Sequence, residues 1–183
     1  GSLQTIDPKN GYWFIMNTDN DFSFDGYPIG EDLEYMLHEG ANLISFPAEG
    51  VYTIEDVIPE NLNGVVYAIL SENVSALYLD GVWQGTLDAF YGGKGYWLKS
   101  YEETTFVFDI DPMELSLARG IDYEIPSIKT LNNFEYIPSS EQAFYYVDNV
   151  EDASVGDWII AYNGNTVVGT REWTGEMIDI PVM

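Results

Sequence analysis

Short apolar runs alternate with polar segments along most of this chain. Such runs are Tyr12 to Met16, Asn42 to Phe46 and Val65 to Leu70, each bordered on at least one side by Gly, Pro or Asn. This is the pattern of strands separated by turns. Asp80-Gly81 and Asn163-Gly164 each stand between two apolar runs and predict tight hairpins. The pattern therefore predicts antiparallel β structure.

One stretch departs from the alternating pattern. Thr53 is followed by Glu55 and Asp56, so its side chain is placed to cap a short helix that Pro59 ends. The fold class that we predict is mostly β, built of antiparallel β modules with one or two short helices.

A repeat marks the N-terminal half of the chain. Gly11-Tyr12-Trp13 recurs as Gly95-Tyr96-Trp97, and an ungapped comparison at this offset of 84 residues gives eight identities in 23 positions. We interpret the chain as one full unit, from about Gly11 to Lys94, followed by the opening of another. The strand pairs Tyr12–Phe24 and Tyr96–Phe108 are expected to superpose, with Trp13 and Trp97 equally buried.

The residue pattern changes after the repeat. Gly156 to Tyr162 and Thr166 to Gly169 read as a hairpin, and Ile178 to Val182 reads as a last strand. We expect a repeat-containing β module over 1–109, with its repeat strands at 11–25 and 95–109. A β-sandwich-like module is expected over 110–183, incomplete at its C-terminus.

The charge balance restricts the partners of the protein. Thirty-one Asp and Glu face six Lys and Arg, a net charge of −25. Such a surface repels nucleic acid and anionic membranes, and it attracts cations such as Ca²⁺. A role in solubility explains the same charge. No apolar stretch approaches the ~20 residues that span a bilayer, so we expect no membrane insertion.

Calcium is the metal that the composition favours, and two places suit it. Asp19, Asp21 and Asp25 alternate on a loop and strand edge, while Asp109 and Asp111 follow the second repeat strand. A third acidic cluster, with the same ambiguity, comprises Glu151, Asp152 and Asp157. Capping of loops by Asx turns is the alternative explanation for all three.

Aromatic side chains suggest a ligand surface. Flat rings stack on the apolar faces of sugars, and neighbouring polar groups bind the hydroxyls. The candidates, which stand in or near predicted loops, are Trp83, Tyr91, Tyr101 and Trp173. Packing between modules is the alternative explanation for these four rings.

The sequence gives little support for catalysis. There is no Cys, which excludes thiolate chemistry and Cys-based metal sites, and His38 is the single histidine. We expect His38 to decorate the surface. With so many acids, no single carboxylate pair points to glycoside hydrolysis. The expected protein is not an enzyme.

Two motifs resemble modules of large secreted and cell-surface proteins of marine and gliding bacteria. Gly40 to Pro47, with Trp83-x-Gly85 and Gly93 to Leu98, resembles the "GWNLIS…GKGYWLK" module, although Ala41 replaces its usual aromatic residue. Gly156 to Gly164, with Val168-Gly169, is similar to the "GDxIxxFxGxxxVG" β-sandwich module.

The resemblance implies a secreted or cell-surface location and a non-catalytic role in adhesion, matrix or filament assembly. Its partners would be glycans or neighbouring protein modules, with self-assembly by strand addition. The alternative is a carbohydrate-binding appendage of a secreted hydrolase. These remain expectations.

Overall fold

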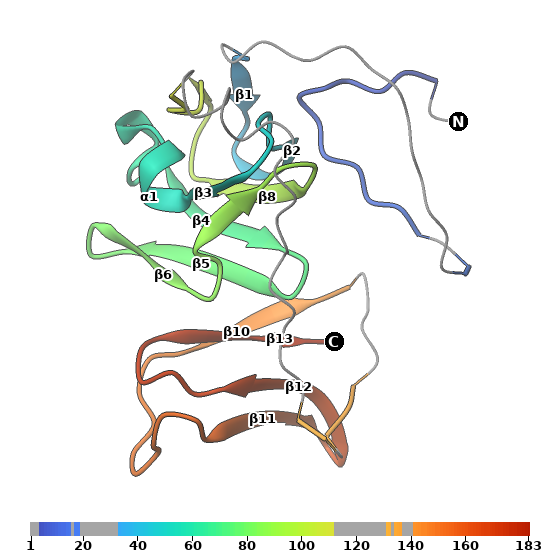
Figure 1. Cartoon of the computed structure of the whole chain (residues 1–183), viewed down its shortest axis with the longest axis vertical. Coiled ribbons are helices and arrows are strands. Elements are labelled where there is room, and N and C mark those ends of the chain that lie inside the picture. The colour runs from blue at the N-terminus through green and yellow to red at the C-terminus, as the bar shows by residue number, and fades with distance from the viewer. Residues whose placement is uncertain (1–3, 16, 19–32, 112–130, 133, 137–140) are drawn as a thin grey trace. The chain divides into compact units, whose positions relative to one another are not determined.

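The computed structural model describes residues 4–15, 17, 18, 33–111, 131, 132, 134–136 and 141–183 (Figure 1). The helical elements of these residues are α1 (Ile54–Val57) and the 3-10 turn η1 (Glu60–Leu62). The strands are β1 (Tyr35–Leu37), β2 (Gly40–Ser45), β3 (Val51–Thr53), β4 (Val66–Ser71), β5 (Val74–Leu79), β6 (Val82–Gly85), β7 (Ala89–Tyr91), β8 (Gly95–Ser100), β9 (Thr104–Phe106), β10 (Ala143–Val147), β11 (Trp158–Asn163), β12 (Thr166–Glu172) and β13 (Ile178–Val182).

The protein is mostly antiparallel β, as the alternating pattern predicted. The largest sheet has the order β2-β8-β4-β5-β6, and four two-stranded sheets pair β1 with β9, β3 with β7, β10 with β13 and β11 with β12. No helix within the described ranges is long and apolar enough to cross a membrane.

The chain divides into two compact units. The first takes the described parts of Gly1–Tyr67 and Ala89–Tyr123, and the second takes those of Ala68–Asp88 and Glu124–Met183. The expected boundary at residue 109 would leave residues 68–88 with the N-terminal module. In the structure these residues group with the C-terminal strands, because the β5–β6 hairpin contacts β13.

Turn chemistry explains the two predicted hairpins. Asp80 and Gly81 have φ of 52° and 88°, and they join β5 to β6 where Leu79 pairs with Val82. Two consecutive residues with positive φ match the twist of the flanking strands. The β11–β12 hairpin also forms, but its central residues are Gly164 and Asn165, one residue later than the predicted Asn163-Gly164, because Asn163 pairs with Thr166.

The predicted short helix is present as α1. Thr53 caps it, since its hydroxyl accepts a hydrogen bond from the Asp56 amide at 3.3 Å. The last turn closes on Ile58, directly before Pro59. Ile54 and Val57 are buried, so the helix adds an apolar face to the core of the first unit.

Aromatic rings form the core of the first unit. The Phe108 ring lies 5.0–5.5 Å from four other rings and meets each of them edge-on. Those four are Tyr35, Phe46, Phe90 and Phe106. Three of them come from β1, β7 and β9, and Phe46 directly follows β2, so one cluster joins the sheet β1–β9, the sheet β3–β7 and the end of β2.

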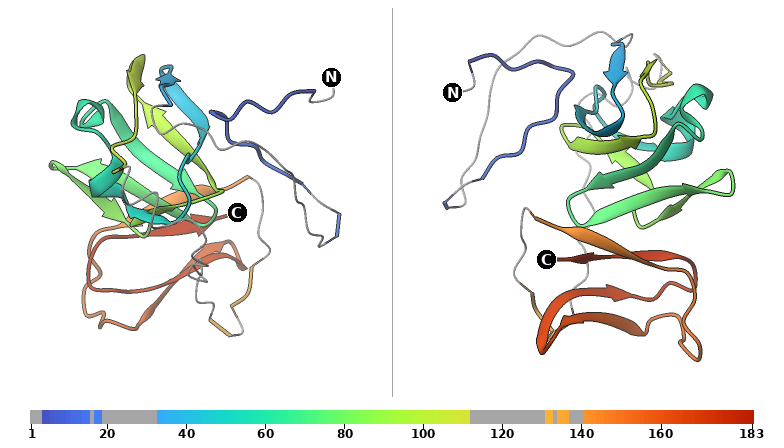
Figure 2. Two further views of the ribbon diagram at one scale, coloured as in Figure 1. Left: turned by 45° about the horizontal axis from the view of Figure 1, so that its top comes forward. Right: turned by 180° about the vertical axis from the view of Figure 1, so that it is seen from behind.

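The second unit pairs two small sheets in a sandwich-like arrangement. Figures 1 and 2 show β12 beside β13, and the Met183 amide donates to the Val168 carbonyl at 3.1 Å. Gly169 sits where the strands meet most closely, because a Cβ there would lie 2.0 Å from the Pro181 carbonyl oxygen.

The predicted equivalence of the two Gly-Tyr-Trp segments is wrong in the described residues. Residues 11–15 form no strand, whereas Gly95 to Ser100 form β8 and pair with β2 instead of with the Phe108 segment. Trp13 and Trp97 are 46% and 38% exposed, not buried. On β8, Tyr96 and Leu98 point inward, so Trp97 between them must point outward. Phe24 lies outside the described residues.

The close approach at Gly169 gives a direct stability test. Replacing Gly169 with Ala should lower the free energy of unfolding by about 1–3 kcal/mol, because the new methyl group overlaps a main-chain oxygen. Gly95→Ala is the control, since its methyl group would meet its nearest atoms at 3.4–3.6 Å. Urea unfolding measures both, and equal stabilities would contradict the close contact.

Candidate functional site

The predicted calcium ligands fall into two groups. Asp19, Asp21 and Asp25 lie outside the described residues. Asp109 and Asp111 are described and exposed, and the Asp109 amide donates to the Val57 carbonyl at 2.9 Å. Within the described ranges no group of three or more His, Asp or Glu is placed to hold a metal ion. Calcium binding therefore remains a prediction.

The third acidic cluster contains a local loop cap. One carboxylate oxygen of Asp157 accepts a hydrogen bond from the Ser154 amide at 2.8 Å. Asp152 has a φ of 64°, a conformation that Asp tolerates better than most residues. Asp157 thus caps its loop through an amide three residues earlier, not through an Asx turn, and calcium binding at this cluster stays a prediction.

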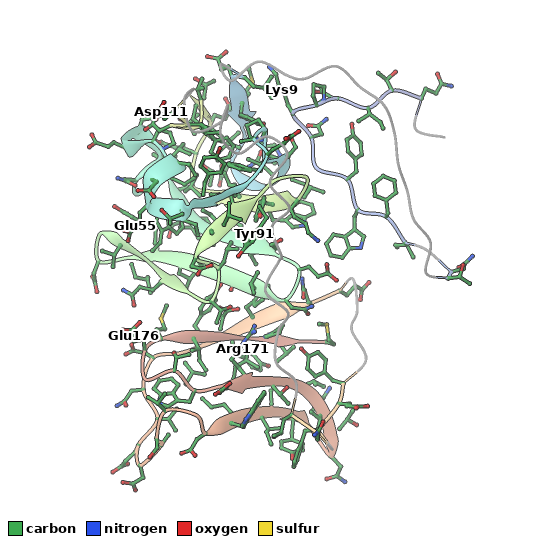
Figure 3. All side chains as sticks on the ribbon, in the orientation of Figure 1. Lys9, Glu55, Tyr91, Asp111, Arg171 and Glu176 are labelled. Atoms are coloured by element: carbon green, nitrogen blue, oxygen red, sulfur yellow. The ribbon has the colours of Figure 1, made fainter. Side chains whose placement is uncertain are left out.

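Two of the four candidate ligand rings are partly covered. Trp83 is half-buried in β6 and packs against Tyr78, with the ring centres 5.1 Å apart. Tyr91 is half-buried at the end of β7, where its amide donates to the Tyr96 hydroxyl at 2.7 Å (Figure 3). Both rings keep some accessible surface.

The other two candidates have opposite environments. Tyr101 is 65% exposed and stacks on the half-buried Tyr67 ring, with centres 4.3 Å apart and planes at 28°. Trp173 is only 5% exposed, and its main chain is hydrogen bonded to Gly156 and Asp157. A ring so covered offers no open face to a sugar, so Trp173 is not a candidate for sugar binding in this structure.

His38 stands at the turn between β1 and β2, exposed as expected. Its Nδ1 lies 2.6 Å from the Glu39 carbonyl oxygen. The turn itself is held by Asn42, whose side chain accepts from the His38 amide and donates to the His38 carbonyl, each at 2.9 Å. The neighbourhood of His38 is therefore that of a turn.

Sequence reasoning missed the outer edge of β2. The Gly11 amide donates to the Leu43 carbonyl at 3.1 Å, and the Ser45 amide donates to the Lys9 carbonyl at 3.2 Å. Asn10 and Ile44 form an antiparallel bridge between these two bonds. The Ser45 hydroxyl also donates to the Pro8 carbonyl. Residues 8–11 thus lie along the edge of β2, joined to it by these hydrogen bonds and one isolated bridge.

Glycine is required for this fit. A Cβ on Gly11 would lie 2.8 Å from the Ile44 carbonyl oxygen and from the Leu43 side chain. A Cβ on Gly95 would lie 3.4 Å from the Gly11 Cα. The two glycines of the repeated motif are therefore direct neighbours, with Gly11 bonded to the outer edge of β2 and β8 paired with its other edge. The repeat drew attention to Gly11, but it predicted a strand paired with the Phe24 segment and so did not indicate this edge.

The segment on this edge is folded within itself. The Asp7 amide donates to the Tyr12 hydroxyl at 2.7 Å, and the Asp7 carboxylate accepts from the Lys9 amide at 2.9 Å. The Asn10 amide donates to the Asp7 carbonyl at 3.1 Å. We call residues 7–12 the N-terminal turn and the outer edge of β2 its slot. Directly after the turn, Trp13, Phe14 and Ile15 are 46%, 59% and 81% exposed.

The second unit contains a buried ion pair. Arg171 lies on β12 (labelled in Figure 3). It approaches Asp179 on β13 to 3.5 Å, and the two side chains are 9% and 0% exposed. Arg171 Nε donates to the Asp179 carbonyl at 2.8 Å, and its Nη2 donates to the Asn73 carbonyl at 2.5 Å. One Asp179 oxygen accepts from the Thr86 amide at 2.6 Å. The pair ties the β5–β6 hairpin to the C-terminal strands.

Burial dominates the electrostatics of this pair. It raises the pKa of Asp179 above its ordinary value, against the smaller effects of the Thr86 hydrogen bonds and of Arg171. Burial also lowers the pKa of Arg171, although Asp179 opposes that shift. Within the described part of the chain Asp179 Oδ2 accepts no hydrogen bond, so Arg171 stabilises it through space. The arrangement is a structural clamp.

Comparisons with protein families, curated proteins and solved structures found no match. No family model matches the sequence, and no curated protein and no solved structure shows a significant match to it.

The buried pair predicts strong coupling between its members. Arg171→Met should destabilise the protein by about 3–5 kcal/mol at neutral pH, because it leaves a buried carboxylate without its cation. Adding Asp179→Asn should recover much of this loss. Chemical unfolding of the two single variants and the double variant measures the coupling. The exposed Glu176→Gln is the control, expected to change stability by less than about 0.5 kcal/mol.

The pH dependence of Arg171→Met follows from the raised pKa of Asp179. Because the folded state then holds the proton more tightly than the unfolded state, stability is fully present below the ordinary Asp pKa of about 3.9. It is lost as the pH rises through the folded-state pKa. The double variant should lack this slope. A slope of the opposite sign would show that the carboxylate is stabilised in its ionised form.

Proposed function

We propose that the protein is a non-catalytic module of a secreted or surface protein, acting in adhesion, matrix or filament assembly through strand addition. The observation that carries the proposal is the slot on β2, where the N-terminal turn is held at a strand edge by main-chain hydrogen bonds. Strand addition of this kind is a recurring mode of recognition between protein chains.

Two further features support this proposal. The apolar run Trp13 to Ile15 is exposed beside the N-terminal turn, and exposed apolar segments favour contact with another protein surface. The buried acid and base of the second unit are hydrogen bonded to main-chain groups, which is a structural use of charge. The extracellular location is supported by the sequence resemblance alone.

Self-association should depend on concentration and on salt. Two copies, each with a net charge of −25, repel each other, and salt screens this repulsion over a Debye length of about 10 Å at 0.1 M. Sedimentation velocity at rising protein concentration should therefore show stronger association in about 0.3 M than in about 0.02 M salt. A monomer under all conditions would contradict assembly between copies.

A carbohydrate-binding appendage is the second candidate, and one observation favours it. The Tyr67–Tyr101 stack presents a ring that is 65% exposed, and such a ring suits the apolar face of a sugar. Calcium, if the acidic clusters bind it, would either support the loops or contact the sugar.

The glycan proposal is tested on an array of immobilised glycans, with and without calcium. Tyr101→Ala should abolish a bound signal, because it removes the exposed ring of the stack. Tyr145→Ala is the matched control, since Tyr145 is 59% exposed in β10 of the second unit. No binding by the unaltered protein in either condition would eliminate this candidate.

A further inference from the structure

We infer that the slot on β2 also accepts the N-terminal turn of a second copy of this chain, so that two copies associate by exchanging residues 8–11. This inference rests on the proposed assembly function and names its site and its partner. Its basis is the seating of the N-terminal turn, the glycine contact at its centre and the charge of the segment.

The slot makes bonds that do not depend on which copy supplies the N-terminal turn. Its groups are the Leu43 carbonyl, the Ser45 amide and the Ser45 hydroxyl. They bind main-chain atoms of Pro8, Lys9 and Gly11, and each bond is the same in either chain. Exchange of an identical element is a low-cost route to a dimer for this reason.

Hydrogen bonds within the N-terminal turn hold its shape independently of the slot. Asp7 holds the Lys9 and Asn10 amides and is itself held by the Tyr12 hydroxyl, so the shape of residues 7–12 depends on bonds within those residues. A pre-organised segment loses less conformational entropy when it binds. The same turn can therefore dock on its own β2 or on that of another copy.

The fit is selective at one position. Gly11 lies against the Ile44 carbonyl, the Leu43 side chain and Gly95, where any side chain would overlap main-chain atoms. The Lys9 carbonyl accepts from the Ser45 amide, and the slot therefore requires a glycine two residues later, at position 11. The N-terminal turn meets this requirement, and a second copy brings the same residue.

The N-terminal segment, residues 4–15, suits contact between two acidic copies because it carries no net charge. Residues 4–15 contain one Asp and one Lys and are neutral overall, whereas the chain carries −25. A neutral segment approaches an acidic copy with little local repulsion. Occupancy by a second copy competes with the turn of the same chain, so it rises with protein concentration.

Complementation between two full-length variants tests the exchange. Gly11→Ala disables the donor, because its methyl group would overlap the slot, while its own slot stays intact. Ser45→Pro disables the slot, since it removes the amide that binds Lys9 and the hydroxyl that binds Pro8. The Ser45 amide faces the outer edge of the sheet, where proline is tolerated.

We expect the dimer of each variant alone to have a dissociation constant at least about tenfold higher than that of the unaltered chain, as measured by sedimentation equilibrium. An equal mixture should form a heterodimer, in which the turn of Ser45→Pro occupies the slot of Gly11→Ala. Thr5→Ala is the control, because the Thr5 side chain is exposed and lies outside residues 7–12, and it should dimerise as the unaltered chain does.

The outcomes separate this inference from the proposed function. If the unaltered chain associates and the variants associate equally well, or their mixture stays monomeric, the exchange is wrong and assembly stands. If the unaltered chain is monomeric at every concentration, both the exchange and the proposed assembly between copies are wrong.

A measurement on the unaltered chain covers the case in which a variant misfolds. In a mixture of isotope-labelled and unlabelled protein, Gly11 of one copy should show a nuclear Overhauser contact to Gly95 of the other. Contacts within single chains only, in a sample that is mainly dimeric, would overturn the exchange.

Discussion

Small sheets need something to pack against, and this constraint governs the protein. Two-stranded sheets are at best marginally stable alone, and four of the five described sheets have only two strands. In the first unit the ring of Phe108 supplies the common contact for β1–β9, β3–β7 and β2. In the second unit the close crossing at Gly169 and the clamp of Arg171 and Asp179 serve the same purpose.

The two units solve this problem with different chemistry. The first buries aromatic rings, whose edge-to-face contacts add to the effect of removing apolar surface from water. The second buries charge, which is costly unless the charge is paired and hydrogen bonded. A buried pair of this kind is weak evidence for stability, and we regard it as a device that fixes the register of the hairpin against β12 and β13.

Local patterns in the sequence were reliable where the structure is local. The Thr53 cap, the Asp80-Gly81 turn and the β11–β12 hairpin follow from side-chain and backbone preferences of a few residues. The repeat misled because identical Gly-Tyr-Trp segments have different neighbours. Gly95 begins a strand inside the sheet, whereas Gly11 lies at its edge, so Trp13 and Trp97 are both exposed for different reasons.

The site was harder to predict than the fold. Nothing in the sequence around Trp173 distinguishes it from an exposed loop ring, since its burial depends on strands distant along the chain. Asp179 carried a recognisable signal, an acid inside an otherwise apolar strand near the only described arginine. The slot on β2 depends on a main-chain approach that composition and periodicity do not encode.

The unequal burial of the five tryptophans gives the protein a built-in optical probe. Trp13 and Trp97, both in the first unit, already meet water in the folded state, at 46% and 38% exposure. Trp173 of the second unit is 5% exposed, and Trp83 and Trp158 of that unit are half-buried. Because indole emission moves to longer wavelength on contact with water, a red shift during denaturation reports chiefly on the opening of the second unit. Near-ultraviolet dichroism of the Phe108 ring cluster would follow the first.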